Sequence, residues 1–340
     1  MNKRAALILA GGKAERFQLP NQPWQDKALA QIGGEPLLVK AVQNIHEVVD
    51  EIVICVNSEE RKNRYSQLLK QQGAEKVQFV IDLEDYPVKG PALAIVSGLQ
   101  SISSEHCLTL PVDMPFMKAE VVEYMFAASR GFDVVVPMWP DGTIETLVMT
   151  LDRKKTLNIA QTLCALNKPR ANNLMRGASK LLLVSPLQKI KTFDPDFRSF
   201  ININSGEDLS KLPPRSTEGG LKENRVINRG SLSISAVRRL GDGAKFFSES
   251  NLHDAKKVFE ECQMSFVANN HHFWVALSAE KKAEVLRGMD MRFSSQAKEA
   301  FAEAAASYES EAQEYVLKGC KRLAECAVAD KEFCQAQTID

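Results

Sequence analysis

The stretch Leu7-Ile8-Leu9-Ala10-Gly11-Gly12-Lys13-Ala14, followed by Arg16 and by the pair Asp26-Lys27, decides the fold. Its apolar run predicts a buried strand, and the two glycines that end the run let backbone N–H groups come close to a ligand. Arginine and lysine both bind phosphate oxygens, so Arg16 and Lys27 suit a phosphate-rich ligand. Because open α/β sheets bind ligands at the carboxyl ends of their strands, the sequence predicts a nucleotide site here. A Gly-Gly pair is also common in simple turns, and this loop is neither a Rossmann fingerprint nor a P-loop.

Length and composition are those of an ordinary globular protein. The 340 residues are 44% hydrophobic and 25% charged, which fits two domains or one large one. Lys+Arg and Asp+Glu both number 43, so no net basic charge indicates a nucleic-acid partner. We find no apolar stretch of membrane-spanning length and expect no signal peptide. The seven cysteines include no Cys-x-x-Cys pair, so we expect free thiols. Taken together, these features favour a cytoplasmic location without membrane association.

Residues 5–210 alternate β-branched runs with helical patterns, which predicts an α/β fold with a mainly parallel, Rossmann-like sheet sandwiched by helices. The expected strands are residues 5–10, 51–56, 77–81, 107–110, 134–137, 146–151 and 180–184. The expected helices are residues 36–48, 58–72, 91–101, 119–128, 157–166 and 169–176.

A helical C-terminal region follows a turn-rich segment. Residues 213–232 begin with Pro213-Pro214 and lose periodicity, so we expect a linker between a domain of residues 1–212 and a helical domain of residues 233–340. In the helical domain, apolar residues recur every three or four positions over 252–262, with Asn251 as a candidate N-cap, and again over 301–323. Its role is open between self-association, recruitment of a protein partner and packing against the first domain.

Polar residues at the ends of two later strands are candidates for metal binding. Asp113 follows an apolar strand at the sheet edge expected for Gly11, which favours a Mg²⁺ carboxylate, although an Asp two residues before Pro115 is also typical of a helix start. Asn202 and Asn204 alternate with isoleucine and should project from one face of a late strand over 200–209. Their amide oxygens suit Mg²⁺, but a solvent-facing edge strand explains them equally.

A further candidate combines Asp82 with the segment Lys89-Gly90-Pro91. Gly-Pro at a helix start leaves N–H donors facing outward, which suits an anion such as a nucleotide phosphate. The alternative is a plain helix N-terminus.

In this order, the motifs resemble those of the molybdenum cofactor guanylyltransferases and of the wider MobA-like NTP transferase family. The matching segments are residues 9–16, 26–29, 34–37, 90–94, 111–116 and 200–209. The resemblance extends over roughly residues 4–212 and implies a nucleotidyltransferase fold for that part of the chain. The chain departs from the family at Phe17, which stands where Met-Gly is usual, and in a longer loop over 18–25. Since that loop lies over the nucleotide in the family, the identity of the base stays open.

The resemblance also implies roles for individual residues. A base contact is implied for the loop of Leu9, Ala10 and Gly11, a base or ribose contact for Asn57 and Asp82, and triphosphate binding for Arg16 and Lys27. The full set implied to bind the nucleotide is Leu9, Ala10, Gly11, Gly12, Lys27, Asn57, Asp82, Gly90 and Asp113. The residues implied for catalysis are Arg16, Lys27 and Asp113. Those implied for Mg²⁺ are Asp113 and Asn204, with Asn202 in reserve.

The reaction implied is transfer of a nucleoside monophosphate, most simply GMP from GTP, to a phosphate monoester, most simply molybdopterin cofactor, with release of pyrophosphate. A phosphate oxygen is already ionised at neutral pH, which agrees with the lack of an obvious general base. The alternatives are CTP or GTP with a sugar, polyol or cobinamide phosphate, or a nucleotide-binding scaffold whose helices recruit a client. Candidate acceptor contacts are residues 139–142, residues 145–147, Arg170 and Arg176, although both arginines could also lie on a solvated helix face.

Overall fold

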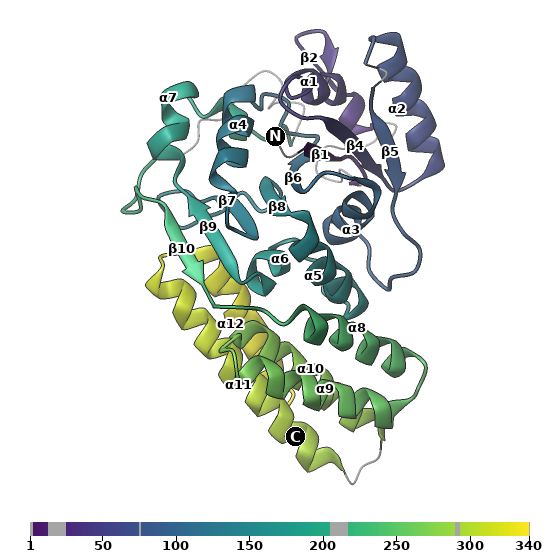
Figure 1. The fold of residues 1–340 in the computed structure, drawn as a ribbon, viewed down its shortest axis with the longest axis vertical. Helices are drawn as coiled ribbons and strands as arrows, with labels where there is room; N and C mark the ends of the chain where they lie inside the picture. The colour runs from purple at the N-terminus through teal and green to yellow at the C-terminus, as the bar shows by residue number, and fades with distance from the viewer. Residues whose placement is uncertain (1–2, 13–24, 75, 205–216, 290–292, 340) are drawn as a thin grey trace.

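One large sheet organises the N-terminal part of the chain (Figure 1). The computed structural model describes residues 3–12, 25–74, 76–204, 217–289 and 293–339. Within these ranges, eight strands pair in the order β10-β9-β7-β8-β6-β1-β4-β5. Their bounds are β1 (Arg4–Leu9), β4 (Glu51–Val56), β5 (Gln78–Ile81), β6 (His106–Pro111), β7 (Val134–Pro137), β8 (Met149–Asp152), β9 (Lys180–Val184) and β10 (Arg225–Asn228). The short strands β2 (Gln31–Ile32) and β3 (Glu35–Pro36) form a separate hairpin.

The strand directions confirm the mainly parallel sheet. β1 pairs in parallel with β4 and β6, β4 with β5, and β7 with β9. β8 runs antiparallel to both β6 and β7, and β10 runs antiparallel to β9. Parallel strands β1, β4, β5 and β6 therefore end at one edge of the sheet, whereas β8 ends at the opposite edge.

β1 is central and its apolar run is covered on both faces. Leu7 belongs to the hydrophobic cluster on one face and Ile8 to the cluster on the other, and both side chains are fully buried. This explains why the strand reads as a continuous apolar run and does not alternate with polar residues. A Cβ at Gly98 would lie 2.6 Å from Leu7 Cδ1, so glycine at this position lets the helix above pack directly on the strand.

Helices cover both faces of the sheet. Their bounds are α1 (Leu37–Gln43), α2 (Glu59–Gln71), α3 (Pro91–Ser101), α4 (Ala119–Ala128), α5 (Arg153–Ala165), α6 (Asn172–Gly177) and the short α7 (Lys191–Phe193). α3, α5 and α6 share the cluster of Leu7, and α1, α2 and α4 share that of Ile8. α5 begins four residues earlier than predicted because the Asp152 side chain accepts a hydrogen bond from Lys155 N and so caps the helix at the end of β8.

The C-terminal region is helical, as predicted. Its helices are α8 (Ile234–Ser248), α9 (Leu252–Val267), α10 (His272–Met289), α11 (Ser294–Leu317) and α12 (Lys321–Ala336). Figure 1 shows them in green and yellow, packed below the sheet next to α5 and α6. Asn251 caps α9, as expected. The period expected over 301–323 is interrupted at Gly319, whose φ of +69° ends α11 before α12 begins.

The helices and the sheet share one hydrophobic cluster, which extends from Leu7 in β1 to residues of α11 and α12. Trp274 of α10 lies against Gly177 at the end of α6, and its Nε1 donates to Gly177 O over 2.9 Å. A Cβ at Gly177 would lie 2.8 Å from the indole Cζ2. The absence of a side chain at Gly177 thus lets α10 contact the backbone of α6.

Arg176 on α6 is buried and ion-paired, so the expectation that it meets either an acceptor phosphate or solvent is wrong. Its guanidinium lies 2.7 Å from Glu311 on α11 and 2.5 Å from Asp330 on α12. Burial of a cation demands such partners, which lie 135 and 154 positions downstream. Arg170, by contrast, is exposed.

The segment expected to be a linker contains β10, which continues the sheet beyond β9. The pairing joins Val226 to Leu182 and Ile227 to Leu181. Ile227 is fully buried in the shared cluster. The chain therefore passes from the sheet to the helices through a paired strand, and Ser233 then caps α8.

The cysteines agree with the expectation from composition. All seven cysteines are buried and free, as predicted. Among the helices described, none combines the length and the apolar character needed to cross a membrane.

Candidate active site

Four parallel strands deliver their following residues to one edge of the sheet. The diglycine loop follows β1, Asn57 follows β4, Asp82 follows β5 and Asp113 follows β6. Short backbone hydrogen bonds continue the ladder past the strand ends, from Ala10 N to Cys55 O and from Asp82 N to Val56 O, both 2.9 Å long. The sheet thus brings together residues that are far apart in sequence.

The diglycine loop is held from the side of α2. Asn57 Nδ2 donates to Gly11 O over 2.8 Å, and Arg61 Nη1 donates to Ala10 O over 3.3 Å and to Gly12 O over 3.0 Å. A Cβ at Gly11 would lie 3.4 Å from Asn57 N, so the loop passes close to the start of the segment after β4. Among the described residues, nothing lies within 4 Å of where a Cβ on Gly12 would be.

A lysine, a carboxylate and an amide meet at this edge, and we call these residues the Lys27 cluster (Lys27, Asp113 and Asn204). Lys27 Nζ lies 2.6 Å from Asp113 Oδ2 and 3.1 Å from Asn204 Oδ1. The Lys27 and Asp113 side chains are 13% and 22% exposed, so both are accessible but largely enclosed. Ile203 N donates to Asp113 O over 2.9 Å, and this backbone bond brings Asn204 to the carboxylate.

The predicted late strand is wrong for its described part. Residues 201–204 form an extended segment without strand pairing, attached to the sheet edge by the Ile203 to Asp113 bond. Asn202 is half-buried and Asn204 exposed, whereas Ile201 and Ile203 are buried beside Leu37. The alternation of asparagine with isoleucine therefore reflects an extended segment with one apolar side.

Asp26 positions Lys27, and this role of Asp26 was not predicted from the sequence. Tyr65 OH lies 2.8 Å from both Asp26 carboxylate oxygens, and Asp26 Oδ1 accepts from Ala28 N over 3.2 Å at the start of the 3₁₀ turn Lys27–Leu29. Arg61 Nε lies 3.8 Å from Asp26 Oδ2. Burial raises the pKa of the Tyr65 hydroxyl, so Tyr65 stays a neutral donor. No local motif indicates these contacts, because Tyr65 and Arg61 are on α2.

Asp82 has an unusual environment for a carboxylate. Its Oδ1 is buried and has no hydrogen-bond partner among the described residues. Burial raises the pKa of its carboxyl group to about 6. A buried acceptor without a protein donor costs stability.

Gly90 stands at the start of α3, after the loop that begins at Asp82. Its φ of +104° is a conformation that other residues rarely adopt, and Pro91 follows as the first residue of the helix. No atom of the part of the chain that the structure describes lies within 4 Å of where its Cβ would be. The predicted helix start is therefore correct, and the residue is exposed.

Arg16 lies outside the described residues, as do Lys13, Phe17 and most of the lengthened loop before Asp26. The candidate acceptor contacts are divided. Trp139 and Glu145 are buried and bonded to each other, with 2.6 Å between Nε1 and Oε1. Both side chains therefore contact the interior and not a bound acceptor, whereas Asp141 is exposed.

The Lys27 cluster has a donor set that suits a divalent cation. Asp113 Oδ2 and Asn204 Oδ1 approach one positive group, the Lys27 ammonium, which shows that both oxygens can face the same cation. Mg²⁺ takes one or two protein oxygens and fills its other positions with phosphate and water. In the described part of the chain, no group of three or more His, Cys, Asp or Glu residues forms a closed metal site, and this chemistry requires none.

Comparison with known proteins relates this site to a family. The family model of the MobA-like NTP transferase domain matches residues 6–181, which extend from within β1 to the start of β9 and include most of the edge described above. A probable molybdenum cofactor guanylyltransferase of Methanosarcina acetivorans is 29% identical over 212 residues, which span 62% of this chain and 89% of that protein. A protein of the same name from a Geobacillus species is 31% identical over 166 residues, 48% of this chain and 78% of the relative.

A solved structure agrees in fold. Molybdopterin-guanine dinucleotide biosynthesis protein A from Archaeoglobus fulgidus superposes with a TM-score of 0.50 at 20% identity, over 61% of this chain and 95% of that one. The predicted nucleotidyltransferase fold is thereby confirmed. The family match extends over more than half of the 340 residues and includes the strands that carry the site. The chain belongs to the MobA-like NTP transferase family and is a nucleotidyltransferase.

Proposed function

We propose that this protein transfers GMP from GTP to the phosphate group of molybdopterin cofactor and releases pyrophosphate. The observation that carries the proposal is the Lys27 cluster, which brings together a lysine, a carboxylate and an amide at the sheet edge next to the diglycine loop. The relatives named molybdenum cofactor guanylyltransferase support the choice of base and acceptor.

The chemistry is an in-line exchange at the α-phosphorus. An oxygen of the acceptor phosphate forms a new P–O bond while the bond between the α-phosphorus and the α–β bridging oxygen breaks, and pyrophosphate leaves. The second pKa of a phosphate monoester is about 6, so the attacking oxygen carries its negative charge at neutral pH without a general base. The protein therefore contributes positioning and charge stabilisation.

Each described residue has a task in this scheme. The Lys27 ammonium offsets the charge that accumulates on the leaving pyrophosphate, and Gly12, which has no side chain, admits the phosphates close to the backbone. Asp82, with its unpartnered buried oxygen, accepts a hydrogen bond from the nucleoside. Asp113 and Asn204 would hold a Mg²⁺ ion, which when bound supplies positive charge to the reacting phosphates. We assign Arg16 to the triphosphate on the resemblance alone.

A substrate matrix tests the proposal. Pyrophosphate release is measured with each of the four nucleoside triphosphates, combined with molybdopterin or with a sugar, polyol or cobinamide phosphate. GTP with molybdopterin is expected to react fastest, and omission of Mg²⁺ should stop the reaction. Faster reaction with CTP or with another acceptor would overturn the assignment of substrates. Tight GTP binding without pyrophosphate release for any acceptor would instead favour the scaffold alternative.

A further inference from the structure

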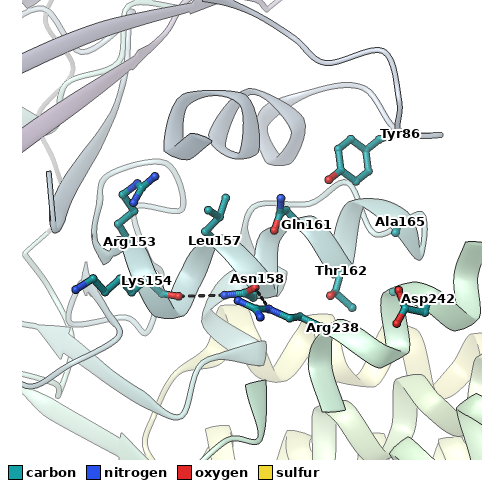
Figure 2. Close-up of a pocket in the computed structure, with 11 residues that line it drawn as sticks. Tyr86, Arg153, Lys154, Leu157, Asn158, Gln161, Thr162, Ala165, Arg238 and Asp242 are labelled. Atoms are coloured by element: carbon teal, nitrogen blue, oxygen red, sulfur yellow. Dashed lines mark hydrogen bonds between the residues drawn. The ribbon is translucent and has the colours of Figure 1, made fainter. Parts of the chain in front are cut away.

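A cavity of about 680 Å³ lies between α5 and α8, away from the site described above (Figure 2). Tyr86, on the loop before α3, lines its other end. The register places α5 at the far edge of the sheet, because Asp152, the residue before α5, pairs with His106 at the start of β6. Asp113 lies beyond the end of the same strand. Since α8 is outside the residues matched by the family model, this cavity is a feature of the longer chain.

Two arginines give the cavity its charge. Arg153 comes from the first turn of α5 and Arg238 from α8, which faces it (Figure 2). Each is fixed through its Nε, which donates to Leu99 O over 2.8 Å in Arg153 and to Asn158 Oδ1 over 2.5 Å in Arg238. Within the described residues, neither guanidinium forms an ion pair, and their Nη groups make no hydrogen bond. Donors that are held in place but unused suit an anion.

Arg153 lies at the N-terminal end of α5. It is the first residue of α5, and the first turn of that helix contains no acidic residue. The Asp152 carboxylate, which caps α5 by accepting from Lys155 N, already offsets the helix dipole at this end. The neighbouring Lys154 is 77% exposed and lies 3.4 Å from Glu105.

The other end of the cavity is suited to a planar polar group. Tyr86 contributes an aromatic ring, Gln161 an amide and Asp242 a carboxylate, which is the one acidic group among the described lining residues. The Gln161 side chain hydrogen-bonds the Tyr86 side chain, so a ring that is held in place for stacking and the Asp242 carboxylate are the groups available to a nucleobase. The volume is within the range of about 300–1,000 Å³ that is typical of small-molecule sites.

We propose that the cavity is a second binding site for a phosphorylated ligand of nucleotide size. Its phosphate binds between Arg153 and Arg238, and its base lies against Tyr86. The loop from Asp82 to Gly90 carries Tyr86 at its middle, so a ligand in the cavity contacts the same loop that supplies two predicted nucleotide residues at the catalytic edge. Occupancy of the cavity is therefore expected to change the KM for the nucleoside triphosphate.

The test uses the full chain with Lys27→Gln, which weakens the catalytic site and leaves the cavity intact. Binding of GMP and of inorganic phosphate is measured by calorimetry, alone and with Arg153→Gln or Arg238→Gln added. The matched control is Arg239→Gln, because Arg239 is the next residue on α8 but pairs with Glu261 outside the cavity. Hydrogen exchange on the same samples locates the bound ligand, and circular dichroism confirms that each variant is folded.

We expect GMP to bind the Lys27→Gln protein at least tenfold more tightly than inorganic phosphate and to slow exchange in α5 and α8. Either arginine variant should weaken GMP binding at least tenfold, whereas Arg239→Gln should change it less than twofold. GMP binding that is absent, insensitive to both arginine variants or equally reduced by the control would overturn the proposal. Equal affinities for GMP and inorganic phosphate would overturn the nucleotide size of the ligand.

Discussion

Lys27 Nζ lies 2.6 Å from Asp113 Oδ2, although 86 positions separate the two residues in sequence. The 3₁₀ turn that Asp26 caps presents the lysine, and the end of β6 presents the carboxylate. Each side chain therefore depends on a different part of the fold. Their contact links the loop after β1 to the centre of the sheet.

Asp113→Asn should lower kcat by a factor of about 10²–10³, which corresponds to about 2.7–4 kcal/mol, because it removes one charge from the reacting centre. The variant keeps the shape of the side chain, but it removes the ion-pair partner of the largely enclosed Lys27, so circular dichroism is used to confirm that it is folded at the assay temperature. Pyrophosphate release at saturating Mg²⁺ and GTP measures the effect. Asp50→Asn is the control, because Asp50 is an exposed aspartate just before β4, at the opposite edge of the sheet. Wild-type turnover of Asp113→Asn would show that the carboxylate takes no part in the reaction.

Asp82→Asn should stabilise the protein at pH 7.5 and impair nucleotide binding. Because burial raises the pKa of Asp82 to about 6, the folded state binds this proton more tightly than the unfolded state does. The free energy of unfolding therefore falls as the pH rises from about 4 through 6, and the amide removes that loss. A pKa shift of this size corresponds to about 3 kcal/mol of unfolding free energy for a fully buried group. Because Asp82 is partly exposed, we expect a gain of about 1–2 kcal/mol.

Melting temperatures of both proteins between pH 4.5 and 7.5 measure this effect. The gain of Asp82→Asn should shrink towards the acidic end of the range, while the KM for GTP rises at neutral pH. A variant less stable than the parent at pH 7.5 would mean that Asp82 has a stabilising partner in the folded protein.

Arg176→Met should destabilise the protein by about 3–5 kcal/mol, because it leaves Glu311 buried without a cation. Urea unfolding measures the loss. The double variant Arg176→Met/Glu311→Leu should recover a large part of it, since both charges are then removed. Arg170→Met, at an exposed position on the same segment, should change the free energy of unfolding by less than about 0.5 kcal/mol. Equal effects at positions 170 and 176 would contradict a special role for the buried pair.

The sequence predicts which candidate site residues share a sheet edge where these residues directly follow parallel strands. The alternation of strands and helices implies parallel strands, so Gly11 and Asp113 had to share an edge once both were recognised as strand ends. The start of α3 was also predictable, since Gly90 and Pro91 are local signals.

Partners contributed by distant helices could not be predicted. Arg61 and Tyr65 lie on α2 among charged residues that look like an ordinary solvated face, yet both contact the sheet edge of the candidate site. Arg176 and Glu311 show no mutual pattern at a separation of 135 residues. Such contacts follow from packing, which local propensity does not encode.

The pairing of β10 with β9 bears on how this protein avoids aggregation. β9 carries three consecutive leucines, Leu181 to Leu183. Without β10 on its outer side, its backbone donors and acceptors on that side would be open to strands of other molecules. The four residues of β10 cover that side, and Arg225 and Asn228 place polar groups on the new outer strand. A chain that ended before residue 225 would therefore expose the edge of β9 to β-pairing with other molecules. This would hold even if every residue of the candidate site were retained.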